Sequence, residues 1–448
     1  MVKYTYKNTG IEWLGEIPEH WIFTPIKKEF KVIPSNVDKK SFDTETDVKL
    51  CNYVDVYYND FLDTTVDYMV ATANDGEIKK FKLQVNDVII TKDSEDPFDI
   101  AVPALITEIQ DNFLCGYHLS MIRSINKKID GKFLFWSLKD EAIASQLFRE
   151  ATGVTRWAIA SRHIKNSTIS FPPLPEQKAI ANYLDKACER IDKIIEIKQK
   201  QLEKIERYLL IKITDWTTKG IEKSETEKTN CLWIPNIKKG WKIKPLKRML
   251  AQKLKYGANE SAENENKEEP RYIRITDFGG DGNLRNDTFK SLPIDVAKPY
   301  MLQEGDVLFA RSGATVGKTF IFKNYDGKAC FAGYLIKANC EQTRLIPEFL
   351  YYFTKSKAYQ EWKNLIFTQA TIQNIGADKY QYLLMPQPKI EEQQEIVEAI
   401  EGLWNKSDNL KQNITTQITT LKSYRKSLIH ECVTGKKQVW EGTIENVN

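Results

Sequence analysis

The chain has 448 residues, of which 65 are basic and 61 acidic, and its formal net charge is +4. This length predicts about two to four domains, and a hydrophobic share of 42% excludes a chain that is disordered throughout. The mean hydropathy of −0.47 and the lack of a long apolar run argue against a membrane span, and the N-terminus lacks the apolar core of a signal peptide.

The cysteines and histidines predict neither a disulfide framework nor a metal site. The seven cysteines are scattered and form no CxxC pair, and the four histidines form no HExxH motif. We therefore expect a cytoplasmic protein without a resident metal.

The sequence repeats itself in order. Residues 13–21 (WLGEIPEHW) and 233–241 (WIPNIKKGW) each carry two tryptophans eight residues apart, followed by a proline and basic residues. Three further pairs keep the order, and the offset drifts only from 220 to 216: residues 83–89 and 302–308, 132–134 and 348–350, and 172–177 and 388–393. Because chance agreement at four ordered places is improbable, we infer an internal duplication; the alternative is a coincidence of Pro and Trp spacings.

Each copy mixes strand-like runs with short helices. We predict strands at Asp87–Thr91 and Asp306–Ala310 and a helix at Phe349–Trp362. The polar segment Gly220–Asn230 is predicted to link the copies, and the acidic, low-complexity segment Asn259–Glu269 to form a surface loop.

A long helix is predicted after each Glu-Gln pair, over residues 176–215 and 391–434. In the second helix apolar residues alternate in steps of four and three, which is typical of a coiled coil, whereas in the first the spacing shifts after Ile194, as at a stutter. The predicted seam consists of Ile180, Leu184, Ile191, Leu202, Ile205 and Leu209 in the first helix and Ile396, Ile400, Leu403, Leu410, Ile414, Leu421 and Leu428 in the second.

So narrow a seam needs a partner along its whole length, and two such helices in one chain can supply each other. We therefore predict an antiparallel pair within the chain. The alternative, a helix lying across its own globular domain, would need a wider apolar face.

Residues 310–319 (ARSGATVGKT) resemble a phosphate-binding P-loop. The motif needs four residues between its first Gly and the Gly-Lys pair, and here only three separate Gly313 from Gly317, so nucleotide hydrolysis is not predicted. Side chains suited to phosphates and base edges remain on this segment and at the matching place of the first copy: Arg311, Ser312, Thr315 and Lys318, and Lys92 and Ser94. An ordinary hairpin turn is the alternative.

Two further polar segments, residues 152–157 (TGVTRW) and 368–373 (TQATIQ), precede the proline stretches. Arg156, Gln369 and Gln373 can hydrogen-bond to base edges, while the threonines can equally cap a short helix.

No catalytic residue is predicted. Asp96-Pro97-Phe98 lacks the second proline of the Asp-Pro-Pro-aromatic motif of amino-group methyltransferases. Glu176-Gln-Lys178 resembles half of a nuclease site, but its repeat Glu392-Gln-Gln394 has no lysine, which favours a structural role at a helix start.

Together these elements resemble the specificity (S) subunit of Type I restriction–modification systems. The resemblance covers nearly the whole chain and rests on the paired tryptophans, the proline stretches ending in Glu-Gln, the long helices and the tail Ser427–Lys436. It implies an α+β fold of two tandem target-recognition domains, each followed by a long helix, with an internal pseudo-twofold axis. The expected parts are domain 1 at residues 1–175, spacer helix 1 at 176–215, a linker and domain 2 at 216–390, spacer helix 2 at 391–434 and a tail at 435–448.

The resemblance also implies a function. Each domain would read one half of a split double-stranded DNA target, the helix pair would set the distance between the halves, and two methyltransferase (M) subunits and restriction (R) subunits would assemble on this non-catalytic chain. Cofactor chemistry would belong to those partners, so no cofactor is expected here. The alternatives are a coiled-coil scaffold with duplicated protein-binding domains and a self-contained DNA-modifying enzyme.

Overall fold

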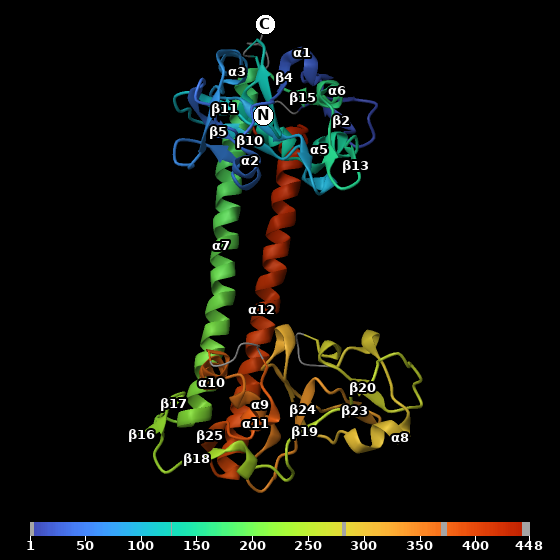
Figure 1. The fold of residues 1–448 in the computed structure, drawn as a ribbon. Helices are drawn as coiled ribbons and strands as arrows, with labels where there is room; N and C mark the ends of the chain where they lie inside the picture. The colour runs from blue at the N-terminus through green and yellow to red at the C-terminus, as the bar shows by residue number, and fades with distance from the viewer. Residues whose placement is uncertain (1–3, 127, 280–283, 369–373, 441–448) are drawn as a thin grey trace. The chain divides into compact units, whose positions relative to one another are not determined.

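The computed structural model describes residues 4–126, 128–279, 284–368 and 374–440 (Figure 1). The chain forms two compact units, one of Met1–Lys198 with Thr416–Asn448 and one of Gln199–Thr415. The last segment of the chain therefore belongs to the same unit as the first. Within the described ranges no helix is both long and apolar enough to cross a bilayer, and no group of three or more His, Cys, Asp or Glu could hold a metal ion.

The first unit is built on two sheets. A five-stranded sheet has the order β4-β12-β8-β10-β6, and a three-stranded sheet has the order β11-β5-β7. Their bounds are β4 Phe30–Pro34, β12 Leu119–Ser124, β8 Val88–Thr91, β10 Pro103–Ile106, β6 Phe61–Leu62, β11 Phe113–Cys115, β5 Thr46–Cys51 and β7 Met69–Ala73. β8 lies at the centre of the larger sheet and is buried along its whole length, which confirms the predicted strand.

Short elements surround these sheets. α4 packs against β8 and β10. The helices are α1 Ile26–Glu29, α2 Tyr53–Tyr58, α3 Asp75–Phe81, α4 Gly131–Leu138, α5 Glu141–Phe148 and α6 Ser161–Asn166, with a 3-10 turn, η1, at Pro97–Asp99. Two small antiparallel pairs join β1 (Tyr6–Asn8) to β2 (Glu16–Pro18) and β3 (Ile22–Pro25) to β15 (Thr168–Phe171).

The second unit repeats this plan with fewer strands. Its main sheet has the order β19-β24-β21-β22, and α9 packs against β21 and β22 as α4 packs against β8 and β10. The strands are β16 Thr226–Cys231, β17 Ile234–Lys238, β18 Lys242–Pro245, β19 Lys255–Tyr256, β20 Arg271–Ile273, β21 Val307–Ala310, β22 Thr319–Ile321, β23 Ala329–Phe331, β24 Leu335–Ala338 and β25 Leu384–Gln387. The helices are α8 Ile294–Ala297, α9 Pro347–Phe353, α10 Lys357–Thr368 and α11 Ala377–Tyr380, with 3-10 turns η2 Leu246–Arg248, η3 Ile275–Asp277, η4 Asn286–Thr288, η5 Lys298–Tyr300 and η6 Gly313–Thr315.

Two predictions for this unit are wrong. The single helix expected at Phe349–Trp362 is divided into α9 and α10, because the buried hydroxyl of Ser356 accepts the backbone N–H of Tyr359 (3.3 Å) and starts a new helix. The linker expected at Gly220–Asn230 contains most of a strand, β16, which pairs with β17.

The repeated motifs attach each long helix to its domain. The indole N–H of Trp21 donates to Glu176 (3.1 Å), and that of Trp241 donates to Glu392 (2.9 Å). The fully buried side chain of the following residue, Gln177, donates to the carbonyl of Pro172 (2.7 Å) and accepts the N–H of Asp130 (2.9 Å).

Gln393 makes the same bonds in the second unit. It donates to the carbonyl of Pro388 (3.0 Å) and accepts the N–H of Ile346 (2.9 Å), and each partner lies 216 residues after its counterpart. A buried amide with both its donor and its acceptor satisfied ties the proline stretch, the helix start and the α4 or α9 start together.

Both long helices are unbroken (Figure 1): α7 spans Leu174–Lys219 and α12 spans Ile390–Val433. α7 thus continues four residues beyond its predicted end. Each helix is followed by a glycine at positive φ, Gly220 (81°) and Gly435 (75°), the usual way to terminate an α-helix.

The buried stripe of α7 differs from the predicted seam. Its buried positions recur at alternating steps of three and four residues, without a stutter. Cys188 and Ile195 are buried, whereas Ile194 is 42% exposed. The stripe consists of Leu184, Cys188, Ile191, Ile195, Lys198, Leu202, Ile205 and Leu209, each buried or partly buried.

In α12 the prediction fails at one position. Leu410 is 53% exposed, and Lys411 and Ile418 are the more buried neighbours on the stripe. The other predicted seam residues of α12, and Ile180 of α7, are buried or partly buried: Ile180, Ile396, Ile400, Leu403, Ile414, Leu421 and Leu428.

Each unit contains segments of both helices. In the first, Arg425 of α12 pairs with Asp192 of α7 (3.1 Å), and Lys198 donates to Gln417, so a later residue of α7 meets an earlier residue of α12. In the second, the hydrophobic core takes in Leu209 and Ile213 of α7 together with Ile396 and Ile400 of α12.

Candidate nucleic-acid interface

In the first unit, the end of β8 brings the two predicted binding segments together. The carbonyl of Lys92 accepts the N–H of Ile159 (2.9 Å), and β9 (Asp93–Ser94) then pairs with β14 (Trp157–Ala158), which pairs with β13 (Thr152–Gly153). Residues 152–157 are therefore a β-hairpin, and the helix-cap alternative is wrong for this copy.

Arg156 is the accessible cation of this hairpin. Its guanidinium donates to Asp93 Oδ1 through Nη2 (2.6 Å) and Nε (3.0 Å), and Nδ1 of His118 lies 2.7 Å from the same oxygen. The side chain of Arg156 stays 52% exposed while the Asp93 side chain is 12% exposed. A guanidinium that is held in one orientation, and whose other N–H groups are not used by Asp93, is suited to the acceptor pair of guanine in the major groove.

Lys92 and Ser94 are used inside the unit. Lys92 Nζ donates to the carbonyl of Ser35 (2.8 Å) and lies over the ring of Tyr117, and burial lowers its pKa. Ser94 is 6% exposed, and its Oγ is 3.2 Å from the hydroxyl of Tyr53. Both side chains therefore shape the loop around Arg156.

A hollow of about 520 Å³ opens beside Arg156 and is lined mainly by acidic and aromatic groups: Tyr53, Ser94, Glu95, Asp96, Asp99 and Arg156. Carboxylates accept hydrogen bonds from the exocyclic amino groups of cytosine. Asp93, His118 and Tyr53 were not among the predicted site residues, since only the fold brings them to Arg156.

The second unit has the same edge with other side chains. The backbone N–H of Arg311, directly after β21, donates to the carbonyl of Tyr334 (3.0 Å), and its carbonyl accepts the N–H of Ile375 (2.9 Å). The guanidinium of Arg311 lies over the ring of Tyr256 at 5.0 Å from the centroid, and Tyr334 is 65% exposed. Bases stack on exposed aromatic rings and guanidinium planes in many nucleic-acid-binding proteins.

Residues 311–318 connect β21 to the antiparallel strand β22. This segment is therefore a hairpin turn, which was the alternative to a P-loop. A P-loop leads into a helix, and this turn leads into a strand. Ser312 forms a backbone bridge with Asn374, Thr315 lies in η6 and accepts the N–H of Lys318 through its carbonyl (2.9 Å), and Lys318 is exposed. The predicted contacts Gln369 and Gln373 lie outside the described residues.

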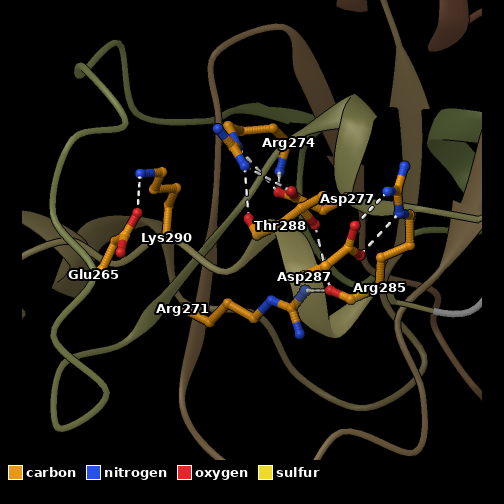
Figure 2. A network of polar contacts seen from close by, with 8 residues as sticks. All are labelled: Glu265, Arg271, Arg274, Asp277, Arg285, Asp287, Thr288 and Lys290. Carbon is orange, nitrogen blue, oxygen red and sulfur yellow. Dashed lines mark hydrogen bonds and ion pairs between the residues drawn. The ribbon is translucent and has the colours of Figure 1, made fainter.

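A network of arginines and carboxylates organises the segment after β20 (Figure 2). Arg274 donates to both oxygens of the fully buried Asp277 (3.1 and 2.8 Å) and to the carbonyl of Thr288 (2.7 Å). Arg271, 2% exposed, donates to the carbonyl of Arg285. These bonds hold two chain segments together, and a single sequence carries no signal that distinguishes such arginines from surface ones.

The sequence profile of the Type I restriction modification DNA specificity domain matches this chain twice, over residues 35–207 and 238–420. The chain belongs to this family. Each match covers most of one copy of the repeat and takes in the candidate edge of that copy.

Named specificity subunits of other organisms match much or nearly all of this chain. A Methanocaldococcus jannaschii protein named as the specificity subunit of the type I restriction enzyme MjaX is 23% identical over 97% of this chain and 98% of its own. The EcoBI specificity subunit of Escherichia coli is 22% identical over 69% of this chain and 66% of its own.

Two solved structures share the fold. A chain from a study of assembly and conformational transition in the type I R-M system superposes with a TM-score of 0.72 at 17% identity, covering 94% of this chain and 99% of that one. The HsdS subunit of Thermoanaerobacter tengcongensis gives a TM-score of 0.54 at 18% identity, covering 94% and 98%.

Proposed function

We propose that this chain recognises a bipartite double-stranded DNA target, each domain reading one half, for a Type I restriction–modification complex. The observation that carries the proposal is the duplicated edge: in both units a central strand ends in a cationic residue whose carbonyl is bonded by a returning loop. The surrounding side chains differ, with Arg156 and carboxylates in one unit and Arg311 and Tyr256 in the other. Equal scaffolds with unequal side chains are what two different half-sites require.

In this proposal α7 and α12 pair antiparallel and set the distance between the half-sites. The contacts of Arg425 with Asp192 and of Lys198 with Gln417 support such a pair, as does the regular stripe of α7. A helix of 46 residues is about 70 Å long at about 1.5 Å per residue. Two modest readers held at one spacing bind as a single bivalent ligand.

Two methyltransferase subunits are the proposed partners, with restriction subunits joining the full complex. Equivalent surfaces in the two units support two copies of one partner. Trp136 of α4 donates to Asp185 of α7 (2.8 Å), and 216 residues later Tyr352 of α9 donates to Glu401 of α12 (3.4 Å). Each pair borders a hollow, of about 660 and 410 Å³ respectively.

Methyl transfer from S-adenosylmethionine and cleavage would then belong to the partners, and this chain would contribute binding alone. Incubating the pure chain with labelled S-adenosylmethionine and DNA should leave the DNA unlabelled, whereas label transfer would favour a self-contained modifying enzyme.

The deciding experiment is a methylome of a host with and without the gene for this chain. We expect one split motif, two short half-sites separated by a fixed number of unspecified bases, to be methylated only when the gene is present. A methylome that does not change, together with no shift of genomic DNA by the assembled complex, would instead support a protein-binding scaffold.

A further inference from the structure

Three lysines gather around one turn of the second unit. Lys318 follows Gly317 at the end of the β21–β22 hairpin, Lys355 follows α9, and Lys363 lies on α10. Lys355 Nζ donates to the carbonyl of Thr319 (2.9 Å), and a Cβ on Gly317 would lie 2.4 Å from Cδ of Lys363, so both lysines flank the turn.

These positive charges are not balanced by protein groups. Within the ranges that the structure describes, no ion pair joins Lys318, Lys355 or Lys363 to a carboxylate. The proximity affects their ionisation: burial and the nearby charge of Lys318 lower the pKa of Lys355 to about 8, and the same two causes lower the pKa of Lys363.

In the first unit the lysine at the same position is neutralised by a carboxylate. Lys139 lies 216 residues before Lys355, and each ammonium stands over the aromatic ring four residues earlier, Phe135 or Tyr351. Lys139 pairs with Asp60 at 2.5 Å, whereas the charged neighbour of Lys355 is another lysine, Lys318. Among the residues that the structure describes, the second unit therefore keeps a group of lysines without a carboxylate partner.

The cluster adjoins the candidate interface. Lys318 lies on the hairpin that begins at Arg311, and Lys363 of α10 flanks the same turn. Several ammonium groups around a compact turn, with no carboxylate paired to them among the described residues, are what an oxyanion site needs.

We propose that Lys318, Lys355 and Lys363 form a phosphate-binding site that holds one backbone phosphodiester of the DNA beside the half-site read by the second domain. This inference rests on the proposed function. The site positions the duplex and reads no base, because phosphate contacts carry no sequence information directly.

The test uses the complex of this chain with its methyltransferase partner and a duplex carrying the motif found in the methylome. Binding is measured at several salt concentrations from about 50 to 200 mM. For K318Q/K363Q we expect the slope of log Kobs against log salt to fall by about 1, with half-site preferences unchanged. K357Q is the matched control, because Lys357 is on the same helix but is paired with Glu361 (3.4 Å); its slope should equal that of the wild type.

Duplexes with a single neutral methylphosphonate identify the ligand. The wild type should be weakened by the substitution at one position flanking the second half-site, and K318Q/K363Q should be insensitive at that position. An unchanged salt slope, an altered base preference, or weaker assembly with the methyltransferase at full DNA affinity would each overturn the phosphate site.

Failure of the proposed function is a separate outcome, seen as a wild-type complex without any preference for a split motif. Binding is compared only among variants whose thermal stability equals that of the wild type. Lys355→Arg, which keeps the charge, should bind like the wild type.

Discussion

At the scale of single residues, the candidate interface depends on buried partners that hold exposed groups. Asp93 is largely buried and fixes both Arg156 and His118, so the guanidinium points outward in one orientation. An ion pair with one exposed partner contributes at most about 1 kcal/mol to stability. The role of Asp93 is therefore to position Arg156 more than to stabilise the unit.

Replacing Arg156 should change what the first domain reads. For Arg156→Ala we expect a loss of about 1–3 kcal/mol of discrimination at one base pair of the first half-site, with the second half-site unaffected. Competition binding against single-base variants of the target measures this, and Arg149→Ala, on another exposed arginine of the same unit, serves as the control. Equal weakening of binding to the target and to every single-base variant, with discrimination unchanged, would show that Arg156 contacts phosphate instead.

The ionisation of Lys355 predicts a pH dependence of DNA binding. The groups around it are Lys318, the carbonyl of Thr319 and the ring of Tyr351, and its pKa of about 8 means that it is charged at pH 7 and mostly neutral at pH 9. Because a bound phosphate favours the charged lysine, affinity should fall as pH rises through 8. Lys355→Arg should remove this part of the dependence, since arginine stays charged; an identical profile for both proteins would contradict the assignment.

At the scale of elements, a buried glutamine at the start of each long helix joins three segments. Gln393 is fully buried and bonds to Arg344, Ile346 and Pro388, so removing its amide leaves backbone groups without partners. Such groups cost about 1–3 kcal/mol each.

We therefore expect Gln393→Leu to lower the free energy of unfolding by more than about 2 kcal/mol. The adjacent Gln394 is exposed and, among the described residues, its side chain bonds to Glu398 (2.9 Å), so Gln394→Leu should stay close to the wild type. Denaturant unfolding of the two variants gives the comparison, and equal stabilities would mean that the motif does not hold the helix to its domain.

At the scale of the whole molecule, the proposed spacing role predicts the effect of a deletion. Removing the seven residues Asp408–Ile414 from α12 keeps the helical phase of a seven-residue repeat and shortens the helix by about 10 Å, about three base pairs of DNA. The methylated motif should keep both half-sites and change the number of bases between them. Loss of one half-site, with the spacing kept, would rule out the proposed spacing role of the two helices.

The sequence by itself determined the duplication, the existence of the two long helices and the family, because repeats and helical periodicity are local patterns that survive in a single chain. It could not choose between adjacent apolar positions such as Ile194 and Ile195, or keep Leu410 out of the stripe, since the partner surface decides which face of a helix is buried.

Only the tertiary structure decided which polar groups act together. Asp93 and Arg156 are 63 residues apart, and Lys139 and Lys355 occupy matching positions in the two copies but differ because one has Asp60 beside it and the other has Lys318. Neither difference leaves a local pattern, because the charge that a side chain meets is set by residues distant in sequence that the fold brings within a few ångströms.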